Sequence, residues 1–144
     1  MFVTETKLSV RYVETDKMGI VHHSNYAVWF EAARTDFTKR LGFSYARVES
    51  MGLNMPLTEL GCKYFGSATY DDDITIVTRI KSLTVARVEF GYTVFKASSD
   101  QPINEGYTIL AFTDANLKPI NVKKKLPELY NLMSNAMAEE NING

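Results

Sequence analysis

The stretch that decides the fold runs from Arg11 to Leu41, RYVETDKMGIVHHSNYAVWFEAARTDFTKRL. Its second half predicts a helix from Asn25 to Leu41, because apolar side chains recur there at spacings of three and four and share one face. The residues on that face are Tyr26, Phe30, Ala33, Phe37 and Leu41. Ser24 is placed to cap the start of this helix, and Gly42 to end it in a left-handed conformation.

Strand patterns lie on both sides of this helix. Residues 7–14 alternate apolar and polar side chains, which predicts a strand with one buried face. Residues 15–24 break that pattern and form a loop that contains Gly19. A short helical turn is expected at 44–50. Four further strand patterns follow at 56–65, 74–80, 87–96 and 106–113.

A second helix is expected near the C-terminus, where Pro127 fits the first turn. We expect it to fray at Glu139–Glu140, because acidic residues oppose the dipole at a helix C-terminus. The order of elements favours an α+β fold, with a mostly antiparallel sheet packed on one long helix. With 144 residues and no linker, the chain is expected to be a single domain, 1–144.

Composition excludes several classes of function. Sixteen basic against seventeen acidic residues leave no basic field to hold nucleic acid. No apolar run has the ~18–20 residues that a membrane span requires, and the first residues do not resemble a signal peptide. A single cysteine, Cys62, excludes an internal disulfide, so we expect a reducing, cytoplasmic location.

The loop before the long helix is where chemistry is expected. It carries Asp16 and Gly19, and backbone N–H groups from about His23 onward point out of the helix start. These amides and the helix dipole favour negative charge. A carboxylate that faces such an anion site is the minimum set of groups that a hydrolase needs. The carboxylate acts as base or nucleophile, and the amides stabilise the oxyanion that develops. Asp16 is also a common type of turn or cap residue, and spacing alone leaves both interpretations open.

A longer pattern surrounds Asp16: Tyr12-x-x-Thr15-Asp16-x-x-Gly19-x-Val21-x-x-x-Asn25-Tyr26-x-x-x-Phe30-Glu31-x-Ala33-Arg34. It resembles the signature of the 4-hydroxybenzoyl-CoA thioesterase type of hotdog-fold acyl-CoA thioesterases. The resemblance extends over about residues 7–130, with weaker patterns at Tyr70-Asp71-Asp72-Asp73 and Lys118-Pro119. Lys17 and Met18 depart from it, since the family often has small residues or proline there.

The resemblance implies a hotdog fold, an antiparallel sheet wrapped around one long central helix. It also implies homodimers that join their sheets and commonly pair again into homotetramers, with active sites between subunits. Asp16 is then the catalytic residue, as nucleophile or as general base for water. The backbone N–H of His23 polarises the thioester carbonyl, and Gly19 lets the loop bring these groups together.

Contacts with coenzyme A follow less directly from the sequence. Lys81, Arg87 and Lys124 are candidate partners for its phosphates, although each is also an ordinary solvated surface charge. Tyr26 is a candidate substrate-binding residue that fits the core equally well. No cofactor is expected, because coenzyme A is part of the substrate.

Other polar residues have simpler interpretations. His22 and His23 are the only histidines, and adjacent residues face opposite ways, so no metal site is expected. Cys62 fits a buried, inert thiol. Glu31 and Arg34 are spaced to form a structural ion pair on the long helix.

The function that these residues predict is hydrolysis of an acyl-CoA thioester to coenzyme A and a carboxylic acid. Two alternatives stay open at this stage: a hotdog-fold hydratase or dehydratase acting on acyl thioesters, and a protein that binds acyl thioesters without catalysis. An acyl-carrier protein is an alternative carrier of the acyl group. Fold alone does not separate these functions, because function depends on the site.

Overall fold

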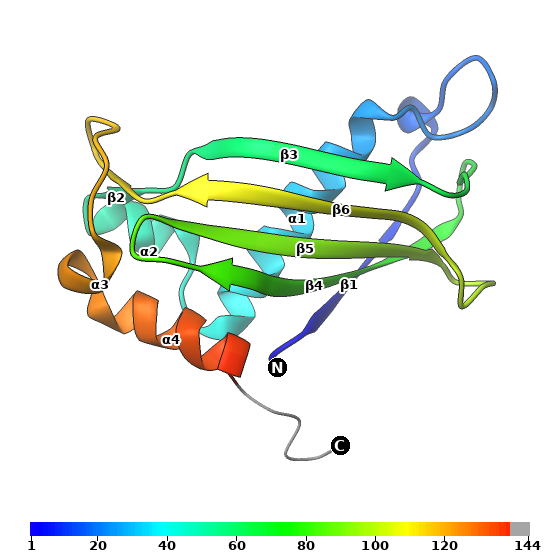
Figure 1. Cartoon of the computed structure of the whole chain (residues 1–144). Helices are drawn as coiled ribbons and strands as arrows, with labels where there is room; N and C mark the ends of the chain where they lie inside the picture. The colour runs from blue at the N-terminus through cyan, green and yellow to red at the C-terminus, as the bar shows by residue number, and fades with distance from the viewer. Residues whose placement is uncertain (139–144) are drawn as a thin grey trace.

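A computed structural model describes residues 1–138 of the chain (Figure 1). Five strands form one antiparallel sheet in the order β1-β4-β5-β6-β3, and two short strands, β2 and β7, pair separately. The strands are β1 (Thr4–Ser9), β2 (Leu53–Asn54), β3 (Leu57–Tyr64), β4 (Asp73–Leu83), β5 (Arg87–Lys96), β6 (Pro102–Ala111) and β7 (Thr113–Asp114). The helices are η1 (Tyr12–Glu14), α1 (Ser24–Leu41), α2 (Tyr45–Ser50), α3 (Val122–Lys125) and α4 (Pro127–Ala138).

The long helix α1 lies against one face of the sheet, behind the strands in Figure 1. Its predicted apolar face is buried, with Phe30, Ala33 and Phe37 fully enclosed. Alternate residues of β4 and β5 meet this face, which explains the period of two in both strands. The predicted α+β class, with an antiparallel sheet on one long helix, is confirmed.

A glycine sets how closely the sheet approaches α1. The Phe30 ring stacks on the Tyr92 ring with centroids 4.4 Å apart. A Cβ atom built on Gly106 of β6 would lie 2.6 Å from the Phe30 ring and 2.9 Å from the Cys62 Cβ. Only glycine therefore permits this close contact between β6 and the helix.

The start of the chain differs from the sequence prediction. The first strand is Thr4–Ser9, and the residues predicted to continue it form the 3₁₀ turn Tyr12–Glu14. The reason is Glu14, which is buried at 3% exposure and turns inward to bond other parts of the fold. Alternation of apolar residues cannot report a buried carboxylate, so residues 10–14 looked like more strand.

The start of α1 also differs, whereas its end is as predicted. Ser24 is the first residue of the helix, so the prediction that it is the cap is wrong; His23 occupies the cap position with helical backbone angles. Gly42 ends the helix with φ +108°.

Near the C-terminus, α4 begins at Pro127 as predicted and buries Leu129, Met133 and Ala136. Its expected frayed end at Glu139–Glu140 lies outside the described residues. The short helix α3 was not predicted, because its lysine-rich sequence has no apolar period; Asn121 caps it by accepting a bond from the Lys124 N–H. In residues 1–138, each helix is too short or too polar to cross a membrane.

Candidate active site

The segment between η1 and α1 is fixed by the buried carboxylate of Glu14. Its two oxygens accept bonds of 2.8 Å from the Arg11 backbone N–H and from the Trp29 indole N–H. Its backbone carbonyl accepts from the His22 N–H and the Asn25 side chain. Burial opposes ionisation of Glu14, but the bonds from the Arg11 N–H and the Trp29 indole, together with the Arg11 guanidinium 3.5 Å away, outweigh burial and lower its pKa. The sequence does not predict this role of Glu14, because its partner Trp29 is fifteen residues away and leaves no signal in the local pattern.

Asp16 sits in a tight turn that this anchor holds in place. Its backbone N–H donates to the Ile20 carbonyl, and its carbonyl accepts from the Gly19 N–H. One carboxylate oxygen, Oδ1, accepts a 2.8 Å bond from the Met18 N–H. The other oxygen, Oδ2, has no hydrogen-bond partner among residues 1–138. Gly19 has φ +81°, the left-handed backbone conformation that glycine adopts without strain and that the sequence predicts for this turn.

The first turn of α1 follows directly. The ring of His22 contacts its first residue, because Nδ1 lies 3.2 Å from the Ser24 N–H and 2.8 Å from the Ser24 hydroxyl. The Asn25 N–H donates to the His22 carbonyl. Within the described chain, the His23 N–H has no partner. It lies at the positive end of an 18-residue helix, where an anion is stabilised.

A tyrosine from the sheet edge holds the helix start from the other side. The Tyr64 hydroxyl of β3 donates a 3.2 Å bond to the His23 carbonyl. Burial and the Cys62 thiol raise the pKa of Tyr64 to about 12, so the hydroxyl stays protonated as a donor. The rings of Tyr64 and Tyr26 meet edge-on, with centroids 5.2 Å apart.

This end of the molecule therefore combines two groups with different chemistry. Counting bonds within residues 1–138, a half-buried carboxylate has one oxygen fixed and one unpaired, and a helix start presents a backbone N–H without a partner. The first can accept a proton or attack a carbonyl, and the second can stabilise a negative oxygen. Both belong to the loop and helix start that the sequence singled out.

Tyr26 does not lie on a surface that could contact a ligand. It is 2% exposed and packs between Trp29 and Tyr64, so in this chain it is a core residue. Its predicted contact with substrate stays a prediction.

The basic residues predicted to contact coenzyme A lie at the end of the folded subunit opposite Asp16. The Asp16 loop lies at the end of the sheet where β4 begins, because Ile20 bridges Thr69, four residues before Asp73. Lys81 is eight residues beyond Asp73 on β4, a distance of about 26 Å along a strand. Arg87 begins β5 and Lys124 lies in α3, both at that far end (Figure 1). A single subunit therefore does not bring these three residues together with Asp16.

The remaining polar candidates supply no second site. The ring centroids of His22 and His23 lie 4.0 Å apart, with the ring planes tilted by 34°. Across residues 1–138, no three His, Cys, Asp or Glu side chains are grouped to hold a metal ion. Cys62 on β3 is half-buried, not buried as predicted, and it packs against the core.

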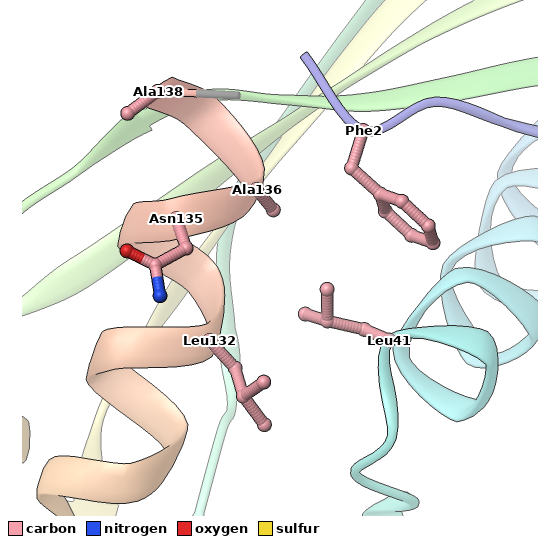
Figure 2. Close-up of a pocket in the computed structure, with 6 residues that line it drawn as sticks. All are labelled: Phe2, Leu41, Leu132, Asn135, Ala136 and Ala138. Carbon is pink, nitrogen blue, oxygen red and sulfur yellow. The ribbon is translucent and has the colours of Figure 1, made fainter. Parts of the chain in front are cut away.

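A cavity of about 420 Å³ lies between the N-terminus, the end of α1 and α4. Figure 2 shows the described side chains that line it: Phe2, Leu41, Leu132, Asn135, Ala136 and Ala138. None of these six titrates, so they supply no acid, base or nucleophile. The cavity is also at the opposite end of α1 from Asp16.

Comparison with known proteins decides the family. The profile described as "Thioesterase superfamily" matches residues 18–103. The chain belongs to the thioesterase superfamily. The Bacillus subtilis protein YneP, which carries a provisional acyl-CoA thioesterase name, is 31% identical over 89% of this chain and 93% of its own length.

Solved structures of proteins named as thioesterases agree with the fold. A DHNA-CoA thioesterase from Staphylococcus aureus superposes with a TM-score of 0.91 and 34% identity, covering 96% of this chain and 93% of that one. A 4-hydroxybenzoyl-CoA thioesterase superposes with a TM-score of 0.79 at 22% identity, covering 90% of this chain and 99% of that one. The second likeness bears on fold alone. The predicted family and the hotdog fold are confirmed.

Proposed function

We propose that this chain hydrolyses an acyl-CoA thioester with Asp16 as the catalytic carboxylate. Thioester hydrolysis as the broad activity follows from family membership and from relatives named as acyl-CoA thioesterases. The observation that carries the finer proposal is that one loop and the helix start it leads into hold two groups without a hydrogen-bond partner among residues 1–138: the Asp16 Oδ2 and the His23 N–H.

The chemistry needs only these two groups and water. Asp16 either removes a proton from water as it attacks the thioester carbonyl, or attacks that carbon itself to form an anhydride that water then cleaves. The carbonyl oxygen becomes negative, and the His23 N–H and the helix dipole stabilise it. The C–S bond breaks, the leaving thiolate takes up the proton that came from water, and coenzyme A and a carboxylic acid leave. We propose no cofactor, because coenzyme A arrives as part of the substrate.

We further propose that a second copy of the chain completes the site. Strand β3 ends the sheet and pairs only with β6 among the described strands. Leu57, Leu60 and Tyr64 on it are 40–50% exposed, which leaves an apolar edge with free backbone groups. Two such edges related by a two-fold axis would pair antiparallel and form one continuous sheet.

That pairing has a consequence for coenzyme A. Antiparallel edges bring the far end of one subunit beside the Asp16 loop of the other. Lys81, Arg87 and Lys124 of the second subunit would then approach the substrate phosphates, which they cannot do within one chain. A dimer of such dimers is the homotetramer we propose, in a cytoplasmic setting.

The test measures thiol release with Ellman's reagent from acetyl-, hexanoyl-, palmitoyl- and 4-hydroxybenzoyl-CoA, and from acyl-carrier protein esters. Wild-type protein and Asp16→Ala are compared after circular dichroism shows that both are folded. Thiol release that depends on Asp16 supports the proposal and ranks the acyl groups. Added or lost water with no thiol release would favour a hydratase or dehydratase, and binding without any turnover would favour a non-catalytic binding protein.

A further inference from the structure

Arg34 is a buried cation on the inner side of α1. Only 8% of its surface is exposed. Nε donates to the Tyr45 hydroxyl at 3.1 Å, and Nη1 donates to the Tyr92 hydroxyl at 3.3 Å and to the Thr108 hydroxyl at 3.4 Å. All three partners are neutral, so they accept hydrogen bonds and contribute no counter-charge.

No carboxylate neutralises this guanidinium among residues 1–138. The ion pair with Glu31 that the sequence predicted does not form there, and the ion pairs that do form join other residues. Nη2 has no hydrogen-bond partner in the same part of the chain. A buried charge without an ionic partner is unfavourable, because low-dielectric surroundings replace its hydration.

Arg34 also lines a cavity, which we call the Arg34 cavity. Its volume is about 290 Å³, and it lies between α1, α2 and β2. Its walls combine an apolar part with a charged part. The lining residues are Glu31, Arg34, Thr35, Tyr45, Val48, Glu49, Leu53, Met55 and Leu110. The volume is near the lower end of the ~300–1,000 Å³ of ligand pockets, which suits a small organic molecule.

The charges of this cavity are arranged by depth. Arg34 is buried, whereas Glu31 and Glu49 are exposed and therefore lie toward solvent. A ligand with one negative group at its inner end would meet Nη2 and form a charge-assisted hydrogen bond. A doubly charged group such as phosphate would be repelled more strongly by the two glutamates on its way in.

We propose that the Arg34 cavity binds the carboxylate of a small organic acid. The carboxylate accepts from Arg34 Nη2, and the apolar body of the acid packs on Val48, Leu53 and Met55. Two sources provide this chemistry. One is a free acid, such as the product of the proposed hydrolysis. The other is a carboxylate at the far end of a substrate's acyl group, and this second source rests on the proposed function.

Binding is tested first, on the whole wild-type protein and without any turnover. Hexanoate and benzoate are titrated into ¹⁵N-labelled protein while NMR follows the side-chain Nε–H signal of Arg34 and the backbone signals of α2. The neutral isosteres hexanamide and benzamide are the controls. We expect the acids to shift these signals and the amides to bind at least tenfold more weakly. Equal binding of acid and amide, or no shift at Arg34, would overturn the proposal.

Two variants examine the cavity from exposed positions, because changing Arg34 itself risks unfolding. Thr35→Trp places a large ring in the lining, and Glu49→Gln removes one repelling charge; both residues are exposed. We expect Thr35→Trp to weaken hexanoate binding at least tenfold, and Glu49→Gln to strengthen it several-fold. Unchanged affinity in Thr35→Trp would contradict the proposed location.

Kinetics then separates the two sources. If the ligand is the far end of an acyl group, Thr35→Trp raises KM for glutaryl-CoA and leaves KM for hexanoyl-CoA unchanged. If the ligand is a free acid, hexanoate changes the hydrolysis rate of acetyl-CoA in wild-type protein and not in Thr35→Trp. Protein that binds hexanoate at Arg34 but hydrolyses no ester would leave this site standing and refute the proposed function instead.

Discussion

Replacing Glu14 by glutamine removes the negative charge that anchors the Asp16 loop to α1. The side chain keeps its shape, but its amide offers one acceptor oxygen where the carboxylate offers two. Either the Arg11 N–H or the Trp29 indole N–H then faces an amide donor. Glu14 is 3% exposed and its bond with Trp29 is buried, so water does not restore that bond when it is lost.

The cost follows from those two bonds. Leaving a buried donor without its acceptor costs about 1–3 kcal/mol. For a chain of 144 residues this lowers the melting temperature by about 3–10 °C. Since the same carboxylate fixes the loop that carries Asp16, we also expect kcat to fall by about tenfold or more.

The assay is thermal unfolding by circular dichroism together with thiol release from the preferred acyl-CoA. Glu5→Gln, an exposed carboxylate on β1, is the matched control and should change neither quantity. Trp29→Phe removes the donor instead of the acceptor. In a double-mutant cycle, Glu14→Gln and Trp29→Phe should cost less together than the sum of their separate costs. Strict additivity, or a stable Glu14→Gln variant with full activity, would refute the anchoring role.

The same carboxylate predicts a pH dependence with a definite sign. The folded protein lowers the pKa of Glu14 below its ordinary value of 4.5. Its contribution to stability is therefore fully present above that ordinary value and is lost as the pH falls through the lower, folded-state pKa. The stability difference between wild type and Glu14→Gln should thus be constant from neutral pH to about 5 and shrink in more acidic solution. A difference that grows on acidification would contradict the direction of the shift.

Two further predictions concern backbone geometry. Gly19→Ala and Gly42→Ala each place a side chain at positive φ without a steric clash, so each should cost about 1 kcal/mol of stability. Only Gly19→Ala should also lower kcat, because only Gly19 shapes the Asp16 turn; equal kcat values for both variants would argue against that. Gly106→Ala drives a Cβ against the Phe30 ring and should cost about 1–3 kcal/mol in urea unfolding, and an unchanged midpoint would show that Phe30 moves freely.

Local sequence predicted the elements whose signals are periodic. The apolar face of α1, its end at Gly42 and the alternation in β4 and β5 all depend on neighbours within a few residues. The predicted first strand went wrong at residues 10–14, because a contact between Glu14 and Trp29 fifteen residues apart decides the local structure. The sequence predicts that β6 begins at Gly106, whereas it begins at Pro102. The reason is that Pro102 and the buried Asn104 are residue types uncommon inside a strand.

The candidate site was located but not fully described from sequence. Asp16, Gly19 and the helix start near His23 were predicted from residue type, helix polarity and resemblance. The sequence predicts Ser24 as the cap of α1, whereas Ser24 is the first helical residue and its N–H donates to the His22 ring, a contact that depends on side-chain conformation. The phosphate partners were chosen by charge alone, and only the sheet topology reveals that Lys81 and Arg87 are distant from Asp16 within one chain.

The central claim is that the Asp16 carboxylate performs the chemistry. The most direct measurement compares kcat/KM for the preferred acyl-CoA in wild type, Asp16→Asn and Asp100→Asn. Asp100 lies exposed between β5 and β6, so its variant controls for the loss of one charge. We predict that Asp16→Asn loses about 10²-fold or more with an unchanged melting temperature, and that Asp100→Asn keeps wild-type activity. An Asp16→Asn variant with wild-type kcat/KM would contradict the account.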